Sequence, residues 1–453
     1  MTVPTPRLIF AALALLLPAL TITSAGGAAS SLGAGGVLFL LCVAAADARR
    51  ARSRAPNFEI DAPALLRSVQ ARAVECQLRL SSQTSTVRTT WALETSPEIS
   101  VEPQQLSLQL AAGTSQTLPF RLSSNLRGKH HVLKLWIQYM SPLGLWEHRR
   151  SRVLNQTLRV YPDLMREQKL LATLFSSHRL GAHRVPQLGQ GHEFDRLREY
   201  LPGDPYDHIH WKATAKRGRP VTKLFQVERS QHVYVAIDAS RLSGRPVPRE
   251  PNGGDSSDGT VPASSEEQLE PYLRIALLLG AAAEQLGDAF GVLGFNDQVR
   301  HFVKASVGRA NRRACREVAA DISQRPVNPD YGELFSFIRQ RVKRRSLIIV
   351  LTSLDDAALA EEFRESVRLV SDQHIVLVAS LRPDGECQIF SGEDANTTSD
   401  LYERLASHLT WKQGKHLARD LAREGVQLLN LPKERLAPGL LSRYFQLKQR
   451  QAL

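Results

Sequence analysis

The chain has 453 residues, of which 43% are hydrophobic and 23% are charged, and its formal net charge is +13. These values exclude an intrinsically disordered chain, and the length exceeds one ordinary core, so we expect two or three folded domains. The four cysteines are scattered and form no CxxC or Cys/His motif, which excludes a disulfide scaffold and a structural zinc site.

Residues 1–54 contain two apolar runs, "LIFAALALLLPALTIT" and "VLFLLCVAAA", and the second run is followed by four arginines between positions 49 and 54. A spanning helix needs about 20 mostly apolar residues, and each run approaches that length only with its small-residue neighbours. Basic residues behind a helix hold that end in the cytoplasm. We therefore predict a transmembrane helical hairpin, multi-pass with two helices and with cytoplasmic soluble domains. A cleaved signal peptide is the alternative.

Residues 55–162 alternate apolar and polar side chains in short runs such as "VECQLRL", "ISVEPQQLSLQL" and "HVLKLWIQY". Turn residues separate these runs, and no long stretch has the 3.6-residue period of a helix. The pattern predicts a small antiparallel β-sandwich, which would serve as a spacer or presentation module.

Residues 232–453 alternate continuous apolar strands with helices. The expected strands are "HVYVAIDAS", "GVLGFND", "SLIIVLTSL", "HIVLVASL" and "VQLLNL", and the expected helices cover "QLEPYLRIALLLGAAAEQLGDAF", 309–324, 332–344, 356–372, 399–424 and the C-terminus. Strands that are apolar on both faces are buried on both faces, so the predicted fold class is α/β with a doubly wound parallel sheet. Residues 241–263 are rich in Pro, Gly, Ser and Asp and predict a flexible loop.

In open α/β sheets, ligands bind at the carboxyl ends of the strands. No glycine-rich phosphate loop follows any of the expected strands, and no Ser/His/Asp or Cys/His pattern lies there. The acids and hydroxyls expected at that edge are Asp238, Ser240, Ser243, Asp297, Thr352, Ser353, Asp355 and Asp356.

A connector, residues 163–231, precedes the first of these strands and contains "GHEFDRLREYLPGDPYDHIHWKATAKRG". This motif, together with "SPLGLW" and "LRVYP" in the sandwich, resembles the domain of unknown function 58 family. The positions that match the family pattern are Glu193, Phe194, Leu197, Arg198, Tyr200, Pro202, Gly203, Asp204, Ile209, Trp211, Lys212 and Ala213. Asp207 stands where the family usually has Arg, so any role of that Arg is in doubt here.

The resemblance implies that residues 232–453 form a von Willebrand factor A-like domain. In a full site of that type, oxygen ligands from D-x-S-x-S, a later Thr and a later Asp suit Mg²⁺. This chain keeps Asp238 and Ser240, but Leu242 occupies the third position and Ser243 lies one place late. We expect no cofactor. A degenerate Mg²⁺ site at Asp238, Ser240 and Ser243 is the alternative, and capping of the strand end by Asp238 and Ser240 is the simpler reading.

The stretch 193–218 offers acids and two histidines but no oxyanion hole or cofactor motif, so we do not expect an enzyme. Its large aromatic side chains predict a structural latch first and a docking face second, with Trp211 buried and with Arg198 and Lys212 paired to Asp204 or Glu193. The side chains assigned to this interaction or latch site are Glu193, Phe194, Arg198, Tyr200, Asp204, Trp211 and Lys212.

The resemblance implies a membrane-anchored cytosolic interaction or assembly protein of a bacterial inner membrane. Its implied partners are a MoxR-type AAA+ ATPase and other membrane or envelope proteins. The alternative is nucleic-acid or acidic-lipid binding through a basic belt, since residues 121–230 hold 20 Lys and Arg against 9 Asp and Glu. Within the stretch 193–218, Glu and Asp interrupt the positive face, so nucleic acid is the less favoured partner.

Overall fold

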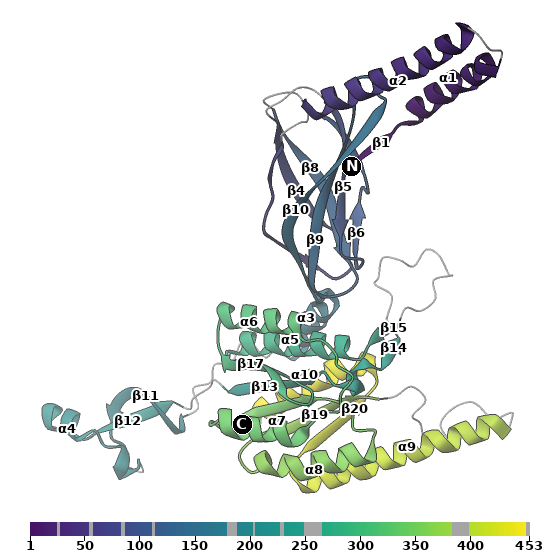
Figure 1. The fold of residues 1–453 in the computed structure, drawn as a ribbon. Helices are drawn as coiled ribbons and strands as arrows, with labels where there is room; N and C mark the ends of the chain where they lie inside the picture. The colour runs from purple at the N-terminus through teal and green to yellow at the C-terminus, as the bar shows by residue number, and fades with distance from the viewer. Residues whose placement is uncertain are drawn as a thin grey trace. The chain divides into compact units, whose positions relative to one another are not determined.

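The structure is a computed structural model, and it divides into two compact units, Met1–Asp163 and Leu164–Leu453 (Figure 1). We describe each unit by itself. The described residues are 1–24, 28–53, 58–82, 87–110, 114–178, 188–202, 204–226, 231–248, 265–382 and 398–449.

Two helices lie at the N-terminus, α1 (Pro6–Ser24) and α2 (Ala28–Ser53). Among the described residues, no helix is long and apolar enough to cross a membrane. The prediction of a transmembrane hairpin is therefore wrong, and so is the expected inner-membrane location. The physical reason is length, because the first apolar run has 16 residues and the second has 10, and a spanning helix needs about 20.

The end of α2 is held to the β-strands of the same unit by polar contacts. The buried carboxylate of Asp47 accepts hydrogen bonds from Ser141 Oγ at 2.5 Å and from the backbone N–H of Leu143 at 3.0 Å. The indole of Trp146 donates to the carbonyl of Ala44 at 2.8 Å. These bonds fix the second half of α2 onto the turn at residues 141–145.

The first unit is otherwise a β-sandwich, in the region where the sequence predicts one. Its strands are β1 Thr2–Pro4, β2 Phe58–Asp61, β3 Leu65–Val69, β4 Val74–Ser82, β5 Val87–Thr95, β6 Ile99–Glu102, β7 Leu106–Leu110, β8 Ser115–Ser124, β9 Gly128–Met140 and β10 Trp146–Tyr161. One sheet has the order β1-β10-β9-β5-β7, with β3 also paired to β10, and the other has the order β2-β4-β8-β6. The pairing of β3 with β10 is parallel, unlike the antiparallel sandwich predicted, because the chain changes sheets between β2 and β3.

The inward residues of the two sheets form one core. Leu78 and Phe120 come from the four-stranded sheet, and Trp91, Leu135 and Leu158 come from the other. The strict alternation seen in the sequence is the alternation between this core and solvent.

The second unit alternates strands and helices, as the sequence predicts. Its elements are α3 Met165–His178, β11 Leu188–Glu199, η1 Tyr206–His208, α4 Trp211–Arg217, β12 Val221–Gln226, β13 His232–Asp238, η2 Arg241–Gly244, β14 Pro246–Pro248, β15 Ser265–Glu267, α5 Leu269–Leu286, β16 Ala289–Phe295, β17 Val299–Ser306, α6 Arg309–Asp321, α7 Tyr331–Arg341, β18 Leu347–Leu351, α8 Ala357–Ser371, β19 Ile375–Leu381, α9 Thr398–Arg423, β20 Gln427–Leu431 and α10 Lys433–Gln449. Of the predicted loop 241–263, residues 241–248 form η2 and β14, and residues 249–263 lie outside the described residues.

The main sheet has the order β17-β16-β13-β18-β19-β20, and all pairings are parallel except that of β17 with β16. Successive residues of β13 contribute to different cores: Val233, Val235 and Ile237 pack with α5, α6 and α10, whereas Tyr234 and Ala236 pack with α7 and α8. Helices therefore cover both faces, which explains why the central strands are apolar without alternation (Figure 1).

The strand order reverses at β13, because the chain proceeds from β13 to β16 on one side and returns to β18 on the other. In open α/β sheets the crevice at such a switch point is the usual ligand site. Asp238 ends β13, and Thr352 follows β18 directly, so these two side chains lie at the switch point.

Candidate functional site

The segment that the sequence singles out forms a small antiparallel ribbon of β11 and β12. The chain between them forms η1 and the seven-residue helix α4. Ile209 bridges to Thr222, and His210 donates its backbone N–H to the carbonyl of Val221 at 2.8 Å, which ties this connection back to β12. Val221 and Thr222 are buried within this ribbon.

A turn at the end of β11 is fixed by Asp204. One carboxylate oxygen accepts a hydrogen bond from Arg198 at 2.7 Å, and the other accepts the backbone N–H of Leu201 at 3.1 Å. The pairing of Arg198 with Asp204 expected from the sequence is therefore present. The side chains of Glu193 and Phe194 lie outside the described residues, and the second ion pair of the ribbon, between Arg219 and Glu199, is one the sequence did not indicate.

Helix α4 is capped at both ends. The Nδ1 atom of His210 accepts the backbone N–H of Ala213 at 3.1 Å, and Gly218 closes the helix with a φ of +68°, a conformation that favours glycine. The hydroxyl of Thr214 accepts the backbone N–H of Val221 at 3.1 Å. These bonds set the position of Trp211 at the first turn of the helix.

Large apolar side chains lie exposed on this ribbon. Tyr206 is 76% exposed, Trp211 is 69% exposed and Leu201 is 52% exposed. The ring of Tyr200 lies 6.0 Å from that of Tyr206. The expected burial of Trp211 is therefore wrong: a ribbon of two strands and a seven-residue helix buries Ile209 and Val221 and has no further layer to cover the indole. We call Leu201, Tyr206 and Trp211 the aromatic face.

Helix α4 also carries exposed basic residues. Lys212, Lys216 and Arg217 are exposed, and none of them forms an ion pair within the part of the chain that the structure describes. In particular, Lys212 does not pair with Asp204, because Arg198 already occupies that carboxylate. Exposed aromatic side chains beside unpaired cations are typical of a surface that binds another macromolecule.

The second candidate site is the crevice at the switch point of the main sheet. Asp238 is fully buried there, and both of its carboxylate oxygens accept hydrogen bonds. Oδ1 accepts the backbone N–H of Ser240 at 2.8 Å, and Oδ2 accepts the hydroxyl of Thr352 at 2.6 Å. The Thr352 hydroxyl also lies 3.0 Å from the phenol oxygen of Tyr331.

Burial raises the pKa of the Asp238 carboxyl above its ordinary value, although the hydrogen bonds from Thr352 and Ser240 oppose this effect. Ser240 caps η2, where its hydroxyl accepts the backbone N–H of Leu242 at 3.3 Å, and the Ser243 hydroxyl donates to the Ser240 carbonyl at 2.9 Å. All three predicted metal-ligand oxygens therefore have a hydrogen-bonding role in the protein itself.

The acids beside this crevice are paired with arginines. Arg245 donates to Asp355 at 2.5 Å, and the Ser353 hydroxyl donates to the same carboxylate at 2.9 Å. Arg241 lies 3.5 Å from the carboxylate of Asp356, which also caps α8. These guanidinium groups bring positive charge to the acids that would otherwise be available to a cation.

The donor set does not fit Mg²⁺. Among the described residues, no three His, Cys, Asp or Glu side chains are grouped to hold a metal ion. The buried position between Ser240 and Ser243 is taken by Leu242, which supplies no oxygen. Mg²⁺ demands near-octahedral oxygen ligands, and a single hydrogen-bonded carboxylate does not provide them.

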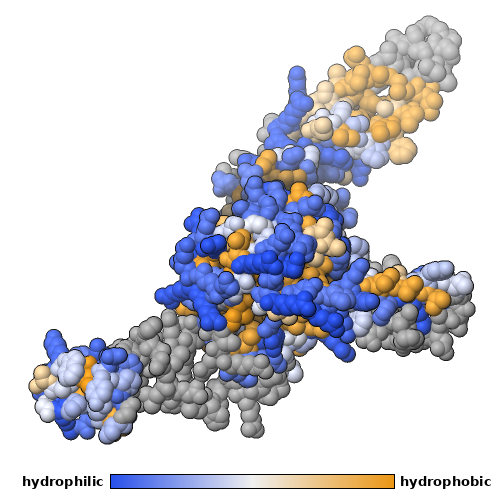
Figure 2. All heavy atoms as spheres, turned by 90° about the horizontal axis from the view of Figure 1, so that it is seen from below, coloured by the Kyte–Doolittle hydropathy of each residue, from blue (hydrophilic) through white to orange (hydrophobic). Residues whose placement is uncertain are grey.

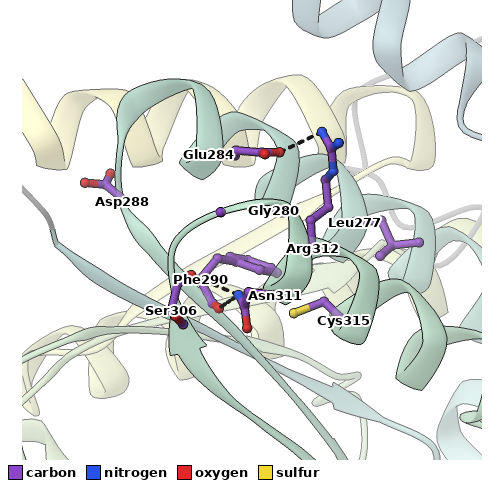
Figure 3. A pocket seen from close by; sticks show the side chains of 10 residues that line it. Leu277, Gly280, Glu284, Asp288, Phe290, Ser306, Asn311, Arg312 and Cys315 are labelled. Atoms are coloured by element: carbon purple, nitrogen blue, oxygen red, sulfur yellow. Dashed lines mark hydrogen bonds and ion pairs between the residues drawn. The ribbon is translucent and has the colours of Figure 1, made fainter.

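A third feature is a small cavity of about 30 Å³ between α5, α6 and β16 (Figure 3). The Asn311 amide donates to the carbonyl groups of Phe290 and Ser306 at 2.6 and 2.9 Å, and Cys315 borders the same space. Burial raises the pKa of the Cys315 thiol to about 12, so it stays protonated and unreactive. The volume suits about one water molecule, and we assign no chemistry to it.

The structure places the predicted site residues in two separate sets. Arg198, Tyr200, Asp204, Trp211 and Lys212 belong to the ribbon, whereas the predicted metal residues belong to the crevice. The sequence did not single out Leu201, Tyr206, Arg241, Arg245 and Tyr331. The sequence does contain a signal for Leu201 and Tyr206, since both lie close to the Pro-Gly-Asp turn.

Comparison with known protein families finds a match in the segment that contains the ribbon. Residues 196–246, which run from the end of β11 through η2, match the model of the family described as "Protein of unknown function DUF58". The predicted resemblance to that family is confirmed over these residues. "Uncharacterized protein YeaD" from Bacillus subtilis (strain 168) is 29% identical over 126 residues. That similarity covers 27% of this chain and 31% of the relative's length.

Similarities to solved structures are weak. The proximal thread matrix protein 1 of the mussel byssus has a TM-score of 0.24 at 11% identity, with 49% of this chain and 45% of that chain covered. The ASH/PapD-like domain of human CEP192 has a TM-score of 0.18 at 11% identity, with 23% of this chain and 86% of that chain covered. Neither carries an argument about function, and the von Willebrand factor A likeness of residues 232–453 stays a prediction.

Proposed function

We propose that this protein is an interaction or assembly protein that docks a protein partner on the aromatic face. The exposure of Trp211 carries the proposal. Trp and Tyr are among the residues that most often dominate the binding energy of protein interfaces. The Trp211 indole is 69% exposed, so a partner that covers it removes apolar surface from water and thereby gains binding free energy.

The design of the ribbon supports a docking role. Its backbone is fixed by the caps of α4 and by the Arg198–Asp204 pair, so the aromatic side chains stand on an ordered support. Little side-chain and loop entropy is then lost on binding, which favours affinity.

The charges beside the aromatic face indicate the chemistry of the partner. Lys212, which follows Trp211 directly, would meet an acidic side chain beside an apolar recess that receives Trp211. The family resemblance suggests a MoxR-type AAA+ ATPase as that partner. We therefore expect an acidic, apolar surface on an ATPase of this type to be the binding site.

The test is quantitative binding of the purified full-length protein to the MoxR-type ATPase encoded nearest to its gene. Trp211→Ala should weaken binding by at least about 30-fold, the loss of an interface hot spot of about 2 kcal/mol. The melting temperature should change little, because the indole is exposed.

Leu126→Ala serves as the control, since it removes a 57% exposed side chain from the other unit and should leave binding unchanged. Equal binding by Trp211→Ala and the unaltered protein would refute the docking role. Binding to DNA or RNA that is lost when Lys212 and Lys216 are replaced would instead favour a nucleic-acid partner.

A further inference from the structure

Helix α9 carries two apolar stripes. Near its C-terminal end, Leu421 is fully buried, and Leu417 packs against the same core of α7, α8 and the main sheet. Near its N-terminal end, Leu401, Leu405 and Leu409 are 54%, 44% and 51% exposed. These three leucines are spaced four residues apart, and we call them the leucine ridge.

The two stripes lie on opposite sides of the helix. Leu405 and Leu421 are 16 positions apart, which at about 100° per residue leaves them roughly 160° apart around the axis. In the first half of α9, the side of the helix that is in line with Leu421 carries Glu403 and Thr410. A continuous helix that buries Leu421 in its own unit therefore turns the leucine ridge away from that unit.

The first half of α9 shows apolar surface. Figure 2 shows apolar side chains on the arm that corresponds to the first half of α9 in Figure 1. A row of exposed leucines on a single helix is unusual for a monomeric protein and marks an interaction surface.

The charges that continue the ridge are basic. At steps of three or four residues, which keep to one side of a helix, Leu409 is followed by Lys412, His416 and Arg419, all of which are exposed. The acids of the first half, Asp400 and Glu403, lie toward the other side of the helix. The outward side of α9 thus presents three leucines and then three basic side chains.

We propose that the leucine ridge binds an acidic amphipathic helix of a partner protein. A partner of this kind packs a row of apolar side chains along Leu401, Leu405 and Leu409 and places acids against Lys412, His416 and Arg419. A second copy of this chain packed in parallel would bring Lys412, His416 and Arg419 against the same residues, which is unfavourable. The charge pattern therefore favours a different, acidic partner.

The probe for this surface is a labelled synthetic helix with leucines four residues apart and glutamates on the same side one turn beyond. Two versions, with the glutamates before or after the leucines, cover both orientations. At least one version should bind the full-length protein saturably in a fluorescence-anisotropy titration. Binding should weaken by at least about 10-fold when the glutamates are replaced by lysines, and also when about 0.5 M salt screens the charges.

Variants of the protein locate the binding. Leu405→Ser and Lys412→Glu should each weaken binding of the glutamate peptide by about 10-fold or more. Neither substitution should unfold the chain, because both side chains are exposed. Leu369→Ser is the matched control, since it alters a 41% exposed leucine of α8 and should have no effect. Trp211→Ala should also have no effect, which separates this surface from the aromatic face.

Three results would overturn the proposal. One is the failure of both glutamate peptides to bind, and another is equal binding of the lysine peptide. The third is a dimer in sedimentation experiments that Leu405→Ser dissociates, because the occupant of the ridge would then be a second copy of the chain.

Discussion

The hydroxyl of Thr352 donates a hydrogen bond of 2.6 Å to Oδ2 of the buried Asp238, across the strand boundary between β13 and β18. The same hydroxyl lies 3.0 Å from the phenol oxygen of Tyr331, where α7 begins. This short chain of side chains joins two strands and a helix at the switch point of the sheet. Its charge state is set by Asp238, whose pKa burial raises.

The first prediction concerns the pH dependence of stability. Because the folded-state pKa of Asp238 is raised, the folded protein binds this proton more tightly than the unfolded chain does. The contribution of Asp238 to stability is fully present below the unfolded pKa and is lost as pH rises through the folded pKa. Urea unfolding should show this loss in the unaltered protein, and Asp238→Asn should remove it.

Asp238→Asn should also be the more stable protein at about pH 8, where the buried carboxylate would be most costly. The amide oxygen of the asparagine can still accept the Ser240 N–H. Its NH₂ group can donate to the Thr352 oxygen once the hydroxyl of Thr352 reorients to donate to Tyr331. Asp238→Ala is the contrasting variant: it leaves the Ser240 N–H and the Thr352 hydroxyl without partners and should cost about 2–4 kcal/mol. A stability difference between Asp238→Asn and the unaltered protein that does not vary with pH would contradict this account.

The second prediction concerns metal ions. We expect about 5 mM Mg²⁺ or Mn²⁺ to leave the melting temperature of the full-length protein unchanged, since Leu242 stands at a ligand position and arginines pair with Asp355 and Asp356. Isothermal titration calorimetry measures this directly. Saturable Mg²⁺ binding at micromolar concentration that Asp238→Ala abolishes would show that the crevice is a working metal site.

The third prediction concerns the anchor of the last helix, α10. The buried carboxylate of Asp288 accepts hydrogen bonds from Tyr444, from Lys448 at 2.6 Å and from the backbone N–H of Gln231 at 3.0 Å. Asp288→Ala leaves these donors without their acceptor and should destabilise the protein by about 3–5 kcal/mol. Tyr444→Phe removes one donor only and should cost about 1–2 kcal/mol, as denaturant unfolding would show. A loss for Asp288→Ala no greater than that for Tyr444→Phe would contradict the anchor.

The central strands could be predicted from the sequence because they are buried on both faces, so composition alone reveals them. The strand β17 could not. Its residues, Val299 to Ser306, are half-exposed at the antiparallel edge of the sheet and include His301 and Lys304. An edge strand needs few apolar residues, and its pairing with β16 is visible only once the sheet has formed.

The sequence was a poorer guide to the two surfaces. It identified Trp211 but not its exposure, since whether an aromatic side chain is buried depends on the layer above it, and the ribbon lacks one. It predicted the ends of α9 to within one residue. That the leucines of the first half face away from the buried Leu421 could be inferred only once the burial of Leu421 was known. The N-terminal helices show the same limit of prediction from sequence. An apolar run that is too short to cross a bilayer has the same composition as part of a longer, membrane-spanning run.

Hydrogen exchange of the backbone amides tests the central claim, docking on the aromatic face, most directly. The full-length protein is compared alone and in the presence of saturating MoxR-type ATPase, and exchange is followed by mass spectrometry. Our account predicts slower exchange in peptides that cover residues 199–223, which contain Leu201, Tyr206 and Trp211, and no slowing in peptides of the β-sandwich. Unchanged exchange across residues 199–223 in a complex that forms would contradict it.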